Sequence, residues 1–182
     1  MGRRQRAAEP QGYHAAQWPC SITEETDMLA TGTTAPDFVL TDHHGRNQSL
    51  TALLADGPLI LYFYPADFTP GCTAEACSLR DLQTDIQRAG LRVVGVSPQS
   101  TDSHQRFREK YSLPFTLLSD PDKKVTRLYD LDGPLGFGVR RGTYLIDQRG
   151  VIQDGVLADL RIGRHEEFVR KAVELRRAKG NR

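Results

Sequence analysis

Cysteine is scarce in this sequence, and its scarcity excludes two classes of protein. The 182 residues include three cysteines, Cys20, Cys72 and Cys77. Three are too few for the multi-bridge framework of a small secreted protein. They cannot complete a cysteine-rich zinc site either, because no histidine stands beside them at ligand spacing. We therefore expect no metal, and we expect reactive thiols in a reducing, cytoplasmic compartment.

Net charge and long hydrophobic runs are also missing. The 24 Lys and Arg residues nearly balance the 23 Asp and Glu residues, which leaves a formal charge of +1. A chain with so little net charge has no overall field that attracts nucleic acid or an anionic membrane. No apolar run approaches the roughly 20 residues of a transmembrane helix. We therefore predict a globular protein with neither a nucleic-acid partner nor a membrane partner.

The first 27 residues lack any hydrophobic periodicity. No apolar segment follows the two arginines near their start, so a secretory signal is disfavoured. We expect residues 1–27 to form a disordered extension, with a transit peptide or a true start at Met28 as alternatives. Cys20 is then a free thiol in this extension. No repeat or linker interrupts residues 28–182, which we expect to fold as a single domain.

The remainder of the chain alternates between strand and helix patterns. Short apolar runs bounded by turn residues predict strands, and apolar residues at helical spacing predict helices. The expected strands cover residues 38–40, 48–50, 59–64, 92–97, 115–118, 143–147 and 151–157. The expected helices cover residues 72–89, 101–111, 121–129 and 164–179. Strands alternating with helices, followed by a hairpin and a last helix, predict an α/β sandwich with a sheet flanked by helices.

Two helices carry more detailed expectations. Asp120 and Pro121 are interpreted as the N-cap and the first residue of helix 121–129. The inward face of the last helix is expected to hold Phe168, Ala172, Val173 and Leu175. Between these helices, residues 133–142 are rich in glycine and predict a loop.

Cys72 lies where a helix is expected to begin, directly after a buried strand and the turn Thr69-Pro-Gly71. Free backbone amides and the positive end of the helix dipole meet at such a position. Both favour a thiolate and lower a cysteine pKa by roughly one to several units, and the hydroxyl of Thr69 could donate to that thiolate. A buried, inert cysteine is the alternative, since free cysteines are often buried. The position at a helix start favours the reactive role.

Cys77 follows five residues after Cys72. In an α-helix this spacing places the two side chains about 140° apart around the axis and about 7.5 Å apart along it. A disulfide needs Cα atoms within roughly 7 Å and side chains that face each other, so a Cys72–Cys77 bond requires the first helical turns to unwind. A buried hydrophobic role for Cys77 is equally compatible with the spacing. Glu75, between them, is interpreted as an acid that caps the first turn.

The segment around these cysteines reads Phe63-Tyr-Pro-Ala-Asp-Phe-Thr-Pro-Gly-Cys-Thr-Ala-Glu-Ala-Cys-Ser-Leu-Arg-Asp81. It resembles the active-site signature of the peroxiredoxins. The family pattern of Pro, three residues, Thr, two residues and Cys is matched by Pro65, Thr69 and Cys72. A second cysteine five positions later, here Cys77, is similar to the branch known as bacterioferritin comigratory protein or peroxiredoxin Q.

The resemblance extends over residues 29 to about 178. Ala35-Pro-Asp-Phe38 matches a common start of the family, and Arg141-Gly-Thr-Tyr-Leu-Ile-Asp147 resembles its arginine-containing strand. Arg140 competes with Arg141 for the role of the family's arginine, but alignment with the family pattern favours Arg141 and leaves Arg140 as a surface charge. The resemblance implies a thioredoxin-like fold.

The resemblance also implies a thiol peroxidase that reduces hydrogen peroxide and organic hydroperoxides. Cys72 would attack the O–O bond as a thiolate and become a sulfenic acid, while Arg141 stabilises the thiolate and the developing charge. Thr69 would hydrogen-bond the peroxide, and Pro65 would shield the pocket from water. Cys77 would resolve the sulfenic acid to an intramolecular disulfide, which thioredoxin or a similar dithiol reduces. Members of this branch are often monomers, and no cofactor is needed.

Two other functions are compatible with the sequence. A thiol–disulfide oxidoreductase would share the fold, but that chemistry normally uses Cys-x-x-Cys, whose sulfurs bond without melting a helix. Here four residues intervene between the cysteines. A redox sensor or a holdase-like binding module would use the same reactive thiol with poor turnover. Consumption of peroxide, compared with reduction of insulin disulfides, discriminates the peroxidase from the oxidoreductase.

Overall fold

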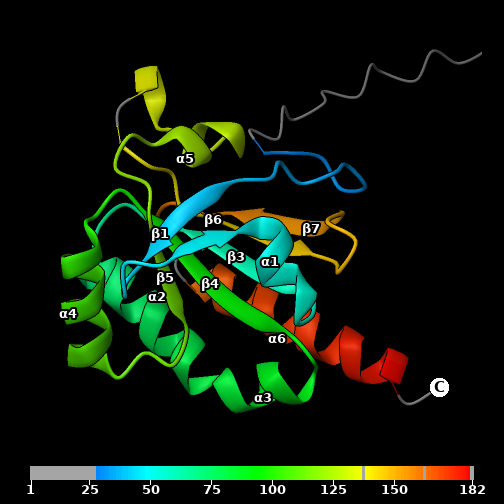
Figure 1. Cartoon of the computed structure of the whole chain (residues 1–182). Coiled ribbons are helices and arrows are strands. Elements are labelled where there is room, and N and C mark those ends of the chain that lie inside the picture. The colour runs from blue at the N-terminus through cyan, green and yellow to red at the C-terminus, as the bar shows by residue number, and fades with distance from the viewer. Residues whose placement is uncertain (1–27, 137, 162, 181–182) are drawn as a thin grey trace, which may run out of the picture.

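The computed structural model describes residues 28–136, 138–161 and 163–180. The expectations for residues 1–27, including the free thiol of Cys20, lie outside these described residues. Seven strands are present in them: β1 (Val39–Asp42), β2 (Asn47–Ser49), β3 (Leu59–Phe63), β4 (Arg92–Ser97), β5 (Thr116–Ser119), β6 (Gly142–Ile146) and β7 (Ile152–Leu157). The strands form one mixed sheet in the order β2-β1-β5-β4-β3-β6-β7 (Figure 1).

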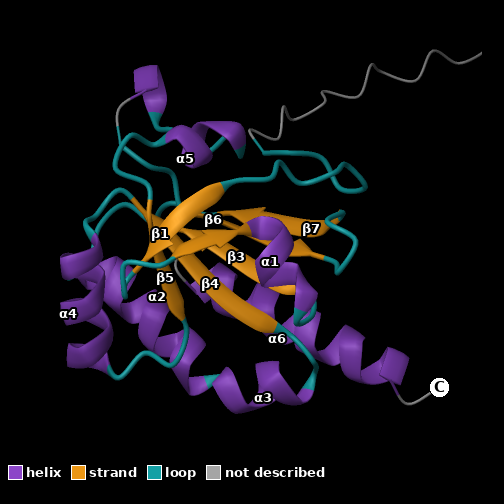
Figure 2. Cartoon of the chain, viewed as in Figure 1, coloured by secondary structure: helices purple, strands orange, loops and turns teal. Residues whose placement is uncertain are grey.

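Helices cover both faces of this sheet (Figure 2). They are α1 (Leu50–Ala55), α2 (Pro70–Asp81), α3 (Gln83–Arg88), α4 (Thr101–Tyr111), α5 (Lys124–Leu128) and α6 (Gly163–Gly180), with a short 3₁₀ turn at Pro134–Gly136. In the ranges that the structure describes, no helix is both long and apolar enough to cross a membrane. The arrangement confirms the predicted α/β sandwich with a central mixed sheet.

The central strand β3 separates two hydrophobic cores. All five of its residues are buried, as its uninterrupted apolar sequence predicts for a strand covered on both faces. Leu59, Leu61 and Phe63 belong to the core on the side of α1 and α5. Ile60 and Tyr62 belong to the core on the side of α2, α3, α4 and α6. This alternation follows from the two-residue period of a strand.

The directions of the strands bring distant segments to one edge of the sheet. Strand β3 runs parallel to β4 and antiparallel to β6, and Phe63 pairs with Gly142. The end of β3 and the beginning of β6 therefore lie side by side. The helix that follows β3 carries Cys72, and the residue that precedes β6 is Arg141. Topology thus brings together two residues that are 69 positions apart in the chain.

Two of the expected helices have different boundaries in the structure. The expected helix 72–89 is two helices, α2 and α3, which meet at Leu82. Helix α2 also begins earlier, at Pro70, because a proline fits the first turn of a helix, where its missing N–H leaves no hydrogen bond unmade. Cys72 still lies in the first turn.

The helix expected at residues 121–129 begins later, at Lys124, so the interpretation of Asp120 and Pro121 as its N-cap and first residue is wrong. The carboxylate of Asp120 instead accepts hydrogen bonds from the backbone N–H groups of Val125 and Thr126 across an intervening turn. Asp120 thereby satisfies donors of the first turn from outside the helix, which local sequence rules do not anticipate.

Helix α6 also differs from expectation on its inward face. Phe168, Ala172 and Val173 are buried as predicted, but the side of the helix that carries Leu175 is open, and this residue is 52% exposed. His165, near the start of the helix, is buried although the sequence analysis did not place it on the inward face. A buried histidine needs polar partners, and those partners lie at the candidate site.

A close backbone approach makes Gly95 a sensitive position. A Cβ atom at Gly95 would lie 2.7 Å from the ring of Tyr62, which is stacked on Tyr64 at 5.3 Å between ring centroids. We expect Gly95→Ala to lower the free energy of unfolding by about 1–3 kcal/mol, because overpacking forces neighbouring groups to shift. Urea unfolding measures this loss. Gly163→Ala is the control, since nothing lies within 4 Å of a Cβ there, and equal midpoints for both variants would contradict the prediction.

Candidate active site

Cys72 lies at the third position of α2, at the edge of the sheet where β3 ends. Its side chain is buried, with 1% of the residue exposed. The Nη2 of Arg141 donates to its Sγ at 3.3 Å. The sulfur therefore has a cation on one side and the N-terminal turn of a helix behind it, and both stabilise negative charge.

Arg141 bridges two groups with the two ends of its guanidinium. Its Nη2 contacts Cys72, and its Nη1 donates to Oε2 of Glu75 at 2.5 Å. Burial alone would lower the pKa of Arg141, but the charges of Glu75 and Cys72 raise it above its ordinary value. The arginine is thus a fixed cation at pH 7. The fork of an arginine holds both partners at once, which the single ammonium of a lysine does less well.

Glu75 has a different place from the one expected. It is not an exposed acid that caps the first turn of α2, because the residue is 0% exposed and faces the core of the site. Burial raises the pKa of Glu75 to about 7, although Arg141 acts to lower it. Behind it, Nδ1 of His165 lies 3.5 Å from Oε1. Glu75 therefore belongs to the buried polar network of the site.

Thr69 and Pro65 border the site from the loop between β3 and α2. The hydroxyl of Thr69 donates to the carbonyl of Ala66 at 3.2 Å, not to the sulfur of Cys72 as the sequence suggested. Thr69 is exposed and Pro65 is half-buried. The side chain of Thr69 is thus accessible from solvent, so a small ligand can reach it.

Cys77 lies further along α2 and is half-buried. Both cysteines are free thiols within one continuous helix of residues 70–81. This helix places the two side chains about 140° apart around its axis and about 7.5 Å apart along it, which is too far for a disulfide. A bond between the two sulfurs requires α2 to unwind.

A second polar network anchors the loop and was missed by the sequence analysis. Asp67, two residues after Pro65, accepts hydrogen bonds from the hydroxyls of Tyr64 and Ser103, each at 2.7 Å. Nδ1 of His104 lies 2.9 Å from Oδ2 of Asp67. No local sequence pattern signals this contact, because 37 residues separate His104 from Asp67.

The same network contains the residue types of a hydrolytic triad, but it cannot act as one. Nε2 of His104 lies 3.5 Å from the hydroxyl of Ser97 and closer, at 3.1 Å, to the carbonyl of Leu118. Ser97 and His104 are both 0% exposed, so no substrate reaches them. One ring nitrogen faces the carboxylate of Asp67, and the other faces the carbonyl of Leu118. The network is therefore structural and holds the loop against α4.

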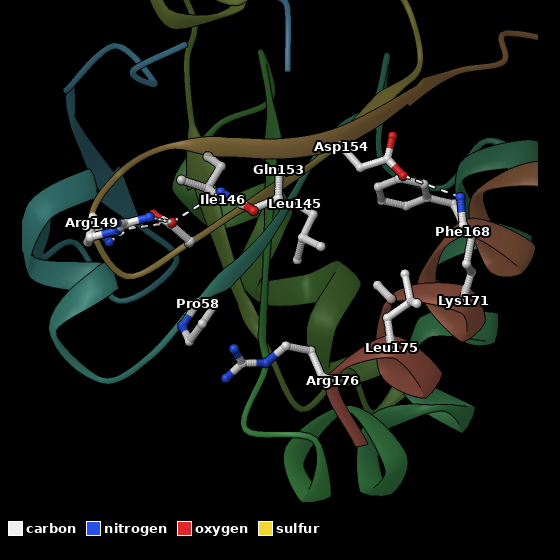
Figure 3. Close-up of a pocket in the computed structure, with 12 residues that line it drawn as sticks. Pro58, Leu145, Ile146, Arg149, Gln153, Asp154, Phe168, Lys171, Leu175 and Arg176 are labelled. Atoms are coloured by element: carbon white, nitrogen blue, oxygen red, sulfur yellow. Dashed lines mark hydrogen bonds and ion pairs between the residues drawn. The ribbon is translucent and has the colours of Figure 1, made fainter. Parts of the chain in front are cut away.

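A cavity of about 340 Å³ lies at the opposite end of the sheet, between the β6–β7 hairpin and α6 (Figure 3). Pro58, before the start of β3, lines it, whereas Cys72 follows the end of β3. Its charged side chains are largely engaged with one another: Arg149 pairs with Asp147, and Lys171 lies 3.6 Å from Asp154. The cavity is thus separate from the cysteine site and offers it no substrate pocket.

Comparison with known proteins identifies the family. A model of the AhpC/TSA family matches residues 31–154, more than half of the chain. A chloroplast peroxiredoxin Q of Sedum lineare is 47% identical over 124 residues, which are 67% of this chain and 66% of that protein. A putative peroxiredoxin bcp of Coxiella burnetii is 45% identical over 130 residues, 68% of this chain and 85% of that protein.

Solved structures agree with the sequence comparisons. Peroxidoxin BcpB of Mycobacterium tuberculosis superposes with a TM-score of 0.74 at 36% identity, covering 81% of this chain and 96% of that chain. Peroxiredoxin Q of Xanthomonas campestris gives a TM-score of 0.71 at 29% identity, covering 82% and 98%. The chain spans 66% of the Sedum protein and 58% of its rice counterpart, less than two thirds of their length. This chain therefore belongs to the AhpC/TSA family, the peroxiredoxins, and within it to the peroxiredoxin Q and bacterioferritin comigratory branch.

Proposed function

We propose that this protein is a thiol peroxidase that reduces hydrogen peroxide and organic hydroperoxides with Cys72 as the attacking sulfur. The observation that carries the proposal is the 3.3 Å contact between the guanidinium of Arg141 and Sγ of Cys72 at the first turn of α2. A buried cation beside a sulfur at a helix N-terminus favours the thiolate, the form that attacks an electrophilic oxygen. The relatives named peroxiredoxin support the same reaction.

The attack itself uses groups that are already positioned. The thiolate of Cys72 displaces one peroxide oxygen from the other, which forms a sulfenic acid and releases water or an alcohol. Arg141 stabilises the charge that develops on the leaving oxygen, as a preorganised and buried donor does. Peroxide approaches past the exposed Thr69, whose hydroxyl hydrogen-bonds it, while Pro65 limits access of water.

The second half of the cycle uses Cys77. Its thiol attacks the sulfenic acid of Cys72 after the first turns of α2 unwind, which releases water and forms an intramolecular disulfide. Thioredoxin or a similar dithiol then reduces that disulfide. Within one chain α2 carries both cysteines, so we propose that the folded domain of residues 28–182 works as a monomer. The free thiols fit a reducing compartment such as the cytoplasm.

A single-turnover experiment tests this function. The reduced protein is mixed with one equivalent of hydrogen peroxide in a stopped-flow instrument, and disulfides are then mapped by mass spectrometry. We expect fast loss of peroxide and a Cys72–Cys77 bond. Cys77→Ser is expected to retain the fast first step, to accumulate a Cys72 sulfenic acid and to lose at least about 100-fold in steady-state turnover with thioredoxin, because oxidation and resolution are separate steps.

Cys72→Ser is the matched control, because it replaces one atom and leaves Cys77 in place. It is expected to consume peroxide no faster than buffer. Fast oxidation that ends in a bond to Cys20 would keep the peroxidase and remove Cys77 from its role. Slow oxidation without a Cys72 sulfenic acid, together with efficient reduction of insulin disulfides, would instead support the oxidoreductase.

A further inference from the structure

Glu75 has one oxygen that is paired and one that is not. Oε2 accepts from Nη1 of Arg141, while Oε1 is buried and has no hydrogen-bond partner among the described residues. The side chain is 1% exposed. A bare carboxylate oxygen in such a place loses its hydration without replacement, which is unfavourable. The geometry therefore calls for a proton at this oxygen.

The group that faces Oε1 is an acceptor. Nε2 of His165 lies 3.2 Å from the carbonyl of Ala158 and must donate there. Its other nitrogen, Nδ1, then carries a single lone pair, which lies 2.9 Å from the hydroxyl of Thr143 and 3.5 Å from Oε1. Burial lowers the pKa of His165 to about 4, so the ring is neutral at pH 7. A proton on Oε1 replaces the repulsion between two acceptors by a hydrogen bond to Nδ1 that is shared with the hydroxyl of Thr143.

Charge balance leads to the same conclusion. The titratable groups that face Glu75 are Cys72 on its own helix, Arg141 before β6, His165 on α6 and, at longer range, Tyr62 on β3. Asp159 and Arg164 act on the far side of His165. Arg141 is the one cation in direct contact among the described residues, and it touches both Glu75 and Cys72. Two buried anions on one cation leave an uncompensated charge, which is costly.

We propose that Cys72 and Glu75 share a single proton beside Arg141. Before oxidation, Glu75 is a neutral acid and Cys72 is a thiolate. When Cys72 is oxidised, Glu75 gives up this proton. This inference rests on the peroxidase function proposed above. Glu75 acts through Arg141, and His165 holds the carboxyl in its neutral form. Both are therefore positioning residues.

The proposed step balances in atoms and charge. The thiolate takes an OH group from the peroxide, so that an S–O bond forms, the O–O bond breaks, and sulfur is oxidised by two electrons while the peroxide is reduced. The leaving alkoxide or hydroxide takes one proton from solvent. Glu75 releases one proton to solvent, so the net uptake of protons is zero. Reactants are thiolate, hydroperoxide and carboxylic acid; products are sulfenic acid, alcohol or water, and carboxylate. The new carboxylate of Glu75 then pairs with Arg141, because the negative charge of the thiolate has been lost.

Proton counting tests the proposal. The protein carries Cys20→Ser and Cys77→Ser so that oxidation stops at the sulfenic acid, and one equivalent of hydrogen peroxide is added at pH 7 in weak buffer with an indicator dye. We expect almost no proton uptake for each Cys72 oxidised. Glu75→Gln in the same background is expected to take up about one proton more, because no carboxyl remains to supply it. The amide N–H of the introduced glutamine can donate to Nδ1 of His165 as the neutral acid does, which favours retention of the fold.

Glu166→Gln is the control, since Glu166 lies on α6 in an exposed pair with Arg170, and it is expected to match its parent. Equal proton uptake by the parent and by its Glu75→Gln variant overturns the inference and leaves the peroxidase intact. Absence of Cys72 oxidation in either protein overturns the peroxidase and the inference together. If Glu75→Gln does not fold, a redox-difference infrared spectrum of the parent decides: loss of a protonated carboxyl band on oxidation supports the proposal, and an unchanged carboxyl region overturns it.

Discussion

Arg141→Met is expected to lower the second-order rate constant for oxidation of Cys72 by hydrogen peroxide by on the order of 10²–10³-fold, the usual cost of removing one preorganised donor from a developing oxyanion. The guanidinium contacts Sγ of Cys72 at 3.3 Å and is itself buried. Its removal takes away both the cation beside the thiolate and a donor to the leaving oxygen. We expect the fold to survive, because a Glu75 that keeps its proton leaves no buried charge unpaired. Stopped-flow oxidation at pH 7 measures the effect.

Two further arginine variants sharpen this result. Arg141→Lys keeps the charge but cannot hold Cys72 and Glu75 with two nitrogens of one rigid fork, so we expect an intermediate loss of about 10-fold. Arg140→Met is the matched control, because Arg140 is the preceding residue and pairs with Asp159 at 3.2 Å. A rate for Arg140→Met as low as that for Arg141→Met would show that the active-site charge had been assigned to the wrong arginine.

Asp67→Asn is expected to lower the free energy of unfolding by about 3 kcal/mol, because it removes a buried carboxylate and leaves the buried groups that contact it without a full set of hydrogen-bond partners. For a domain of this size that loss corresponds to a fall of roughly 6–12 °C in Tm. The side chains of His104 and Asp67 are 0% and 1% exposed, so water cannot replace the missing partner. Differential scanning calorimetry measures the change. The peroxidase rate is expected to fall as well, since Asp67 lies between Pro65 and Thr69.

The effect of Asp67→Asn is also expected to depend on pH. Burial by itself would raise the pKa of Asp67, but the hydrogen bonds and charge of its partners, His104 foremost, lower it below its ordinary value. Its contribution to stability is therefore present above the unfolded pKa of about 3.9 and is lost as pH falls through the folded value. The difference between variant and parent should shrink below about pH 4. Asp122→Asn, in an exposed pair with Lys124, should change stability by less than about 0.5 kcal/mol at any pH.

Local sequence patterns predicted most of the elements of this fold. The apolar run of residues 59–64 and the segment 92–97 are the central strands β3 and β4, because such runs are stable only when both faces are covered. Ser100 caps α4 through a hydrogen bond from the N–H of Ser103, which is the short-range chemistry that favours serine at an N-cap. The predictions were wrong where the outcome depends on more than the local segment: Asp120 binds backbone groups across an intervening turn, and Leu175 is left half exposed.

The sequence by itself determined that Cys72 lies at the start of a helix and that a bond between Cys72 and Cys77 would require this helix to unwind. Both conclusions follow from helix geometry over a few residues. Only the tertiary structure decided the surroundings of that cysteine. Arg141 lies 69 residues from Cys72, and Glu75, an apparent surface acid, became a buried partner once β6 and α6 packed against α2. Burial and charge pairing depend on segments that are distant in the chain, and the physical character of an ionisable group is set by what packs around it.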